Sequence, residues 1–125
     1  MKYVTILLVL LLGILLSCSD DTEDPFTPSI SVSGTVTNNS GVGGTIIVEI
    51  DYNRRDLADP DGKYSIGITK EYYIDSLYAW VDQDENDRYT AGEPLGFYHS
   101  VSEPERAKPI HARNYDITNI NFTIP

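Results

Sequence analysis

Apolar and polar residues alternate along several short stretches of the chain. This period of two is typical of half-buried β-strands, whose successive side chains point to opposite faces. No window shows the sustained 3.6-residue periodicity of an amphipathic helix. The pattern therefore predicts an all-β fold, with strands at Ile30–Val36, Ile46–Tyr52, Tyr64–Ile68, Tyr73–Val81, Leu95–Tyr98 and Ile120–Ile124.

Turn-forming residues separate these stretches. Asn38–Gly44 is rich in asparagine and glycine, and Asp59-Pro60-Asp61-Gly62 predicts a tight turn in which the glycine supplies a positive φ. Ser102–Asn114 contains two prolines and predicts a loop. Six or seven short strands separated by turns indicate a small antiparallel β-sandwich of about seven strands.

The start of the chain has a different composition. Lys2 precedes an apolar segment from Val4 to Leu16, and a small residue, Ser17, comes before Cys18. This order describes a secretory signal peptide, and the apolar segment is shorter than the ~20 residues of a membrane-spanning helix. Leu15-Leu16-Ser17-Cys18 resembles the lipobox of bacterial lipoproteins. The resemblance implies that residues 1–17 are removed and that Cys18 is acylated. An ordinary secretory leader followed by an incidental cysteine is the alternative.

Several acyl chains on one cysteine would hold the protein stably on a membrane without spanning it. Residues 18–29 are acidic, contain two prolines and show no periodicity, so we expect a lipidated tether. The acidic run after Cys18 also resembles a short tag that sends some Gram-negative lipoproteins to the outside of the outer membrane. We therefore expect an outer-membrane lipoprotein facing either the cell surface or the periplasm.

Composition restricts the partners of this chain. The 125 residues include 19 acidic and 9 basic side chains, for a net charge of −10 at pH 7. This charge argues against nucleic-acid binding, which depends on lysine and arginine at phosphates. With a single cysteine no intrachain disulfide can form, so residues 30–125 must be stabilised as one domain by packing, or by packing and a metal. The expected partners are the membrane, through the anchor, and an envelope protein or glycan.

Two short motifs suggest a family for this domain. Ser33-Gly34-Thr35-Val36, followed by Asp61-Gly62-Lys63-Tyr64-Ser65-Ile66, resembles the carboxypeptidase-regulatory, transthyretin-like domains. The resemblance implies an Ig-like Greek-key sandwich with no active site of its own.

Residues 82–93, with the sequence DQDENDRYTAGE, match most of a twelve-position calcium-binding loop. Calcium prefers six to eight hard oxygen ligands. The ligand positions of this loop supply three carboxylates, one amide, one hydroxyl and one backbone carbonyl. The sixth position departs from the motif, because it has Asp87 where glycine makes a sharp turn. The loop also resembles acidic loops ending in Gly-Glu-Pro in secreted and lipid-anchored bacterial sandwich domains. A solvated acidic loop is the alternative. The expected ligands are Asp82, Asp84, Asn86, the carbonyl of Arg88, Thr90 and Glu93.

The chain also has nine tyrosines and one tryptophan. If Leu77, Ala79 and Val81 face the core, then Tyr78 and Trp80 face outward, where they are weak candidates for ligand binding. Ordinary strand aromatics are the alternative. No nucleophile elbow, phosphate loop or zinc motif is present, so we do not expect an enzyme. The sequence therefore predicts a lipid-anchored envelope module with a structural calcium loop, acting in binding or scaffolding. Surface glycan binding is the alternative function.

Overall fold

The computed structural model describes residues 30–51, 54–100 and 103–125. The expected leader, Cys18 and the expected acidic tether lie outside the described residues, as does Tyr52 at the end of one expected strand. Within the described ranges, no helix is long and apolar enough to span a membrane.

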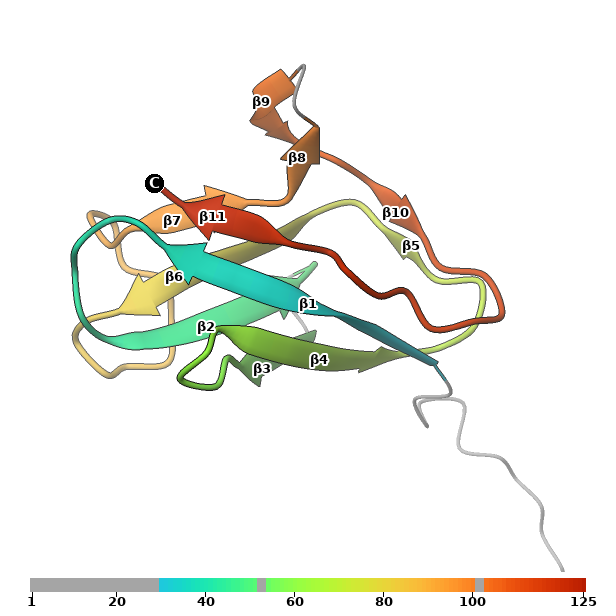
Figure 1. Ribbon diagram of the computed structural model, residues 1–125, viewed down its shortest axis with the longest axis horizontal. Coiled ribbons are helices and arrows are strands. Elements are labelled where there is room, and N and C mark those ends of the chain that lie inside the picture. The colour runs from blue at the N-terminus through green and yellow to red at the C-terminus, as the bar shows by residue number, and fades with distance from the viewer. Residues whose placement is uncertain (1–29, 52–53, 101–102) are drawn as a thin grey trace, which may run out of the picture.

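All the regular elements in the described residues are β-strands, so the all-β prediction is confirmed (Figure 1). There are eleven of them rather than about seven, because several are only two or three residues long. They are β1 (Ile30–Asn38), β2 (Thr45–Ile50), β3 (Arg54–Leu57), β4 (Lys63–Ile68), β5 (Tyr73–Ile74), β6 (Leu77–Asp82), β7 (Leu95–Phe97), β8 (His99–Ser100), β9 (Glu103–Ala107), β10 (Ile110–His111) and β11 (Phe122–Ile124).

The strands form a sandwich of two main sheets. One sheet has the order β11-β1-β4 and the other has the order β3-β2-β6-β7, with the short pairs β5-β10 and β8-β9 beside them. The chain crosses repeatedly between the sheets, as in a Greek-key sandwich. The pair β1-β11 is parallel, whereas a wholly antiparallel sandwich was expected. A parallel pair needs a long connection, and the irregular segment after β10 lets the chain return alongside β1.

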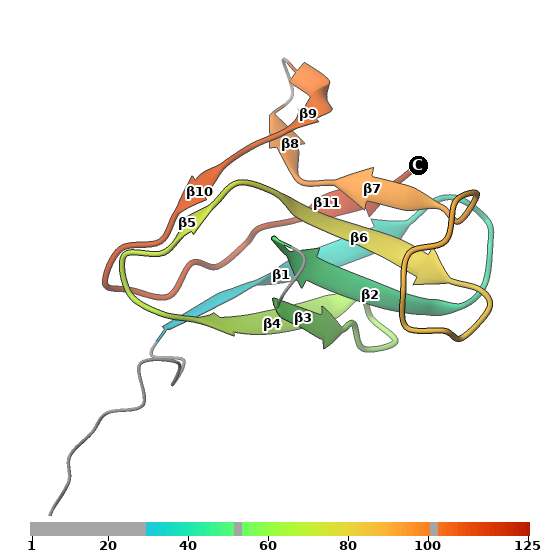
Figure 2. The same cartoon turned by 180° about the vertical axis from the view of Figure 1, so that it is seen from behind.

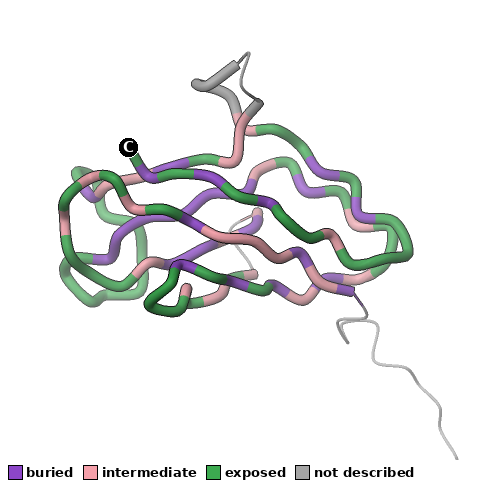
Figure 3. Tube along the Cα trace, in the orientation of Figure 1, coloured by how far each residue is buried: buried purple, intermediate pink, exposed green. Residues whose placement is uncertain are grey.

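The core lies between the two sheets. Leu77, Ala79 and Val81 point inward from β6 and are fully buried, as the alternation predicted. Every residue of β6 is buried, whereas along β4 buried residues alternate with exposed or partly exposed ones (Figure 3). Tyr64, which belongs to β4, is buried, and its hydroxyl donates to the Ile120 carbonyl at 2.7 Å. Burial raises the pKa of the Tyr64 hydroxyl well above its usual range, and the nearby Tyr98 raises it further. The hydroxyl therefore stays protonated and acts as a donor.

The largest corrections to the sequence-based boundaries are at three places. The stretch expected to be one strand from Tyr73 to Val81 is broken after β5, where the backbone N–H of Ser76 donates to the Asp51 carboxylate at 3.1 Å. The expected loop 102–114 contains β9, which pairs with β8, and β10, which pairs with β5 through Ile110 and Ile74. The pattern also missed β3, an edge strand whose polar sequence has no apolar alternation.

The turn before β4 forms as expected. Gly62 has a φ of 79°, and its N–H donates to the Asp59 carbonyl at 2.8 Å. The Asp59 side chain accepts the N–H groups of Asp61 and Lys63, both at 2.9 Å. The aspartate therefore organises the turn, while the glycine allows its left-handed step.

Candidate functional site

The acidic loop connects two neighbouring strands of the four-stranded sheet. Asp82 is the last residue of β6, and Glu93 comes just before Pro94 and β7. Because β6 and β7 pair antiparallel, the two ends of the loop are close together. Among the residues that the structure describes, Asp82 and Glu93 are the charged residues that are buried, with exposed fractions of 2% and 8%. A buried carboxylate requires hydrogen-bond donors or a cation.

Both carboxylates accept hydrogen bonds from the loop backbone. Asp82 accepts the N–H groups of Asn86 at 3.3 Å and Asp87 at 3.0 Å. Glu93 accepts those of Gln83 at 2.8 Å and Thr90 at 2.7 Å. Each carboxylate thus bridges two points of the loop. These charge-assisted hydrogen bonds hold the loop in place even without a bound ion.

A third carboxylate completes an acidic cluster. One oxygen from each of Asp82, Asp84 and Glu93 lies within 4.8 Å of the others. Negative groups this close repel one another unless a cation or a proton neutralises them. The cluster could hold a metal ion, and its all-oxygen donor set suits a hard divalent cation.

The other expected ligands lie around this cluster. The Asn86 amide nitrogen donates to Asp84 at 2.8 Å and to the Thr90 hydroxyl at 2.9 Å, so the amide must turn over before its oxygen can face an ion. The Thr90 hydroxyl also donates to Asp84 at 3.2 Å. The backbone N–H of Arg88 donates to Asn86 Oδ1 at 2.7 Å. A metal-binding role for the Arg88 carbonyl stays a prediction.

Asp87 adopts the conformation that glycine would take at the sixth position. Its φ is 60°, in the left-handed region, and Glu85 has a φ of 57°. Left-handed geometry costs an ordinary residue roughly 1–2 kcal/mol, although aspartate tolerates it better than most. The loop therefore makes the sharp turn of the motif without its glycine.

The loop also covers part of the outer face of the sheet (Figure 2). Two rows of directly opposed residues cross this face from β3 to β7. The pairing register aligns one mixed row and one apolar row. The mixed row is Arg55, Glu49, Tyr78 and Phe97, and the apolar row is Leu57, Ile47, Trp80 and Leu95.

Tyr78 and Trp80 lie on the outer face, as expected, but they are not open to solvent. Their exposed fractions are 7% and 1%, and with Ile47 they form a second hydrophobic cluster apart from the core. The Tyr78 ring stacks on Trp80 at 5.9 Å, and Tyr89 packs edge-on against Trp80 at 6.4 Å. Tyr89 of the loop packs on Trp80, and Phe97 of β7 lies 5.9 Å from Tyr78. The alternation therefore predicted the direction of the two rings but not their burial.

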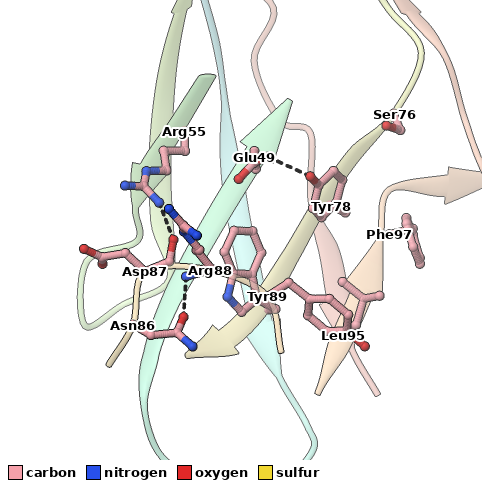
Figure 4. Close-up of a pocket in the computed structure, with 11 residues that line it drawn as sticks. Glu49, Arg55, Ser76, Tyr78, Asn86, Asp87, Arg88, Tyr89, Leu95 and Phe97 are labelled. Atoms are coloured by element: carbon pink, nitrogen blue, oxygen red, sulfur yellow. Dashed lines mark hydrogen bonds between the residues drawn. The ribbon is translucent and has the colours of Figure 1, made fainter. Parts of the chain in front are cut away.

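A pocket of about 840 Å³ lies beside this cluster (Figure 4). This volume falls within the range of small-molecule sites. The sequence pattern singled out Tyr78, Trp80 and the loop residues Asn86, Asp87 and Arg88, but not the other lining residues. Strand register brings several of them together, and that register is not visible in local patterns. The pocket is lined by Glu49, Arg55, Ser76, Tyr78, Trp80, Asn86, Asp87, Arg88, Tyr89, Leu95 and Phe97.

Comparisons with protein-family models, with curated proteins and with solved structures gave no match to this chain. The assignment of a β-sandwich fold therefore comes from the strand pairings of this structure alone. The lipoprotein signal and the transthyretin-like family stay predictions from the sequence.

Proposed function

We propose that residues 82–93 form a calcium-binding loop that stabilises this β-sandwich. The observation that supports the proposal most strongly is the convergence of three carboxylates within 4.8 Å, two of them on buried residues. Calcium accepts six to eight oxygens in a flexible arrangement, whereas magnesium demands near-ideal octahedral geometry. An irregular loop of this composition suits calcium better. Asp82, Asp84 and Glu93 would bind the ion first, and Asn86, the Arg88 carbonyl and Thr90 would complete its ligands.

Calcium should raise the melting temperature of the protein by a few degrees. Loops of extracellular modules bind calcium at about 10⁻⁴–10⁻³ M, so ~1 mM calcium would add a few tenths to roughly 1.5 kcal/mol. For a domain near 100 residues, 1 kcal/mol corresponds to about 4–8 °C. Differential scanning calorimetry with calcium, magnesium and EDTA measures this shift, and magnesium should give less.

Glu93→Gln should remove most of the calcium shift, because it removes a cluster carboxylate. Glu85→Gln is the matched control: it removes one exposed charge from the same loop, outside the cluster. A calcium shift that is equal in both variants would indicate general screening of the acidic loop rather than a bound ion.

We further propose that the domain is displayed at the cell envelope on a lipid anchor at Cys18, where it acts in binding or scaffolding rather than catalysis. The apolar leader, the cysteine and the acidic segment follow one another in the sequence in the order that a lipoprotein signal requires, which supports this proposal. Multiple acyl chains would give stable attachment to the outer membrane.

Cys18→Ala should abolish incorporation of labelled fatty acid and release the protein from the membrane fraction. The substitution removes the sulfur that would be acylated. Membrane fractionation and metabolic labelling check both effects. Retention of the variant at the wild-type level would refute the anchor.

Glycan binding is a second candidate function, and the pocket supports it. Phe97 and Tyr89 present exposed aromatic surface at its margin, with exposed fractions of 37% and 45%. Aromatic faces beside hydrogen-bonding groups suit the mixed apolar and polar surfaces of a sugar. The rings that a sugar would reach first are therefore Phe97 and Tyr89, with the buried Tyr78 and Trp80 behind them.

A further inference from the structure

The pocket beneath the acidic loop has two chemically different ends. Arg55 and Arg88 lie at one end, beside Asp87, whereas Leu95 and Phe97 lie at the other (Figure 4). The cationic residues come from β3 and from the loop, and the apolar residues come from β7. A ligand that spans the pocket would contact the arginine side chains at one end and apolar side chains at the other.

The positive end has unused binding capacity. Arg55 stands opposite Glu49 in the strand register, yet its guanidinium donates to the Asp87 backbone carbonyl. No ion pair among the described residues includes Arg55 or Arg88. A guanidinium has five donors arranged to bind a carboxylate through two parallel hydrogen bonds. Two such groups at one end of the pocket can pair with an anionic ligand group, while the Glu49 and Asp87 carboxylates in the same lining limit how much negative charge the site accepts.

The middle of the pocket offers acceptors and rings. The Tyr78 hydroxyl donates to the Glu49 carboxylate at 2.8 Å, which leaves Glu49 capacity for further donors such as ligand hydroxyls. Phe97 lies 5.9 Å from Tyr78 and continues the aromatic surface outward. The Trp80 indole N–H is buried without an acceptor among the described residues.

From this arrangement we propose that the pocket binds a glycan carrying a hexuronic acid. The sugar carboxylate would pair with Arg55 and Arg88, its hydroxyls would donate to Glu49, and its apolar face would pack on Phe97 and Tyr89. The chain's net charge of −10 repels long polyanions, so a single acidic sugar on an otherwise neutral glycan suits the site best. This inference rests on glycan binding as the second proposed function. The pocket shares Asn86 and Arg88 with the proposed calcium loop, but the inference uses the Arg88 side chain and not its backbone carbonyl.

Matched sugars test the inference directly. NMR titration of the full protein compares methyl glucuronide with methyl glucoside, which lacks the carboxylate. It also compares methyl galacturonide with methyl galactoside, which differ in the same way. At least one uronide should bind about tenfold or more tightly than its neutral partner. Arg88→Gln should remove that preference while leaving the backbone carbonyl at position 88 unchanged. Arg113→Gln, an exposed arginine outside the pocket, should keep it.

The possible outcomes separate the two proposals. Equal binding of uronide and neutral sugar, unchanged in Arg88→Gln, would overturn the acidic-sugar inference and leave glycan binding standing. No binding of any of the four sugars would overturn both. Binding of a short peptide through its terminal carboxylate, with no sugar bound, would also overturn both. Phe97→Ala, at a half-exposed position that should not prevent folding, should weaken uronide binding, and unchanged binding would place the sugar elsewhere.

Discussion

Trp80→Ala should destabilise the protein by about 3–5 kcal/mol, the usual cost of truncating a buried tryptophan. Trp80 is 1% exposed, although it points away from the main core. It packs between the sheet and the acidic loop through Tyr78 and Tyr89. Its loss would open a cavity beneath the loop and lower the melting temperature by about 12 °C or more.

Urea denaturation measures this effect, with Tyr115→Ala as the control. Tyr115 is 63% exposed, so its truncation should change the free energy of unfolding by about 0.5 kcal/mol or less. If Trp80→Ala were as mild as Tyr115→Ala, the outer-face cluster would contribute little to stability. The loop would then have to be held by other contacts.

Asp82→Ala should destabilise the protein by about 2–4 kcal/mol even in EDTA. Its buried carboxylate accepts two loop N–H groups, and hydrogen bonds to charged groups contribute about 1.5–3 kcal/mol each. Relief of the repulsion from Asp84 and Glu93 offsets part of that loss when no ion is bound. Part of this loss would appear as local opening of the loop rather than global unfolding. Hydrogen exchange at Asn86 and Asp87, together with calorimetry, separates the two contributions.

Asp82→Asn is the informative comparison for that variant. The amide keeps one acceptor and the side-chain volume but removes the negative charge, so its stability in EDTA should lie between wild type and Asp82→Ala. Its response to calcium should nevertheless be largely lost. Wild-type stability of Asp82→Ala in EDTA would contradict a structural role for this carboxylate.

Local patterns predicted much of the fold because side-chain direction alternates residue by residue along a strand. The inward faces of β1, β4 and β6 follow directly from that alternation. The polar edge strand β3 carries no such signal, since it lies at the sheet margin. The parallel pairing of β11 with β1 depends on a connection that turns the chain around, which no short window encodes.

The two sites differ in the same way. The acidic cluster could be predicted because its three carboxylates lie within twelve residues of one loop, at spacings that a calcium ligand set shares. The pocket could not, because Arg55, Glu49 and Phe97 come from three strands aligned only by register. The burial of Trp80 was equally hidden, since the covering residue, Tyr89, belongs to the loop.

The calcium loop is tested most directly by equilibrium dialysis of the wild type, Asp87→Gly and Glu93→Gln with labelled calcium. The wild type should bind one calcium ion per chain. Asp87→Gly should bind it at least as tightly, because glycine takes the φ of 60° found at this position without strain. Glu93→Gln should bind about tenfold or more weakly, since calcium affinity depends on the number of charged ligands. Absence of saturable binding in both the wild type and Asp87→Gly would mean that the cluster is only a hydrogen-bonded acidic turn.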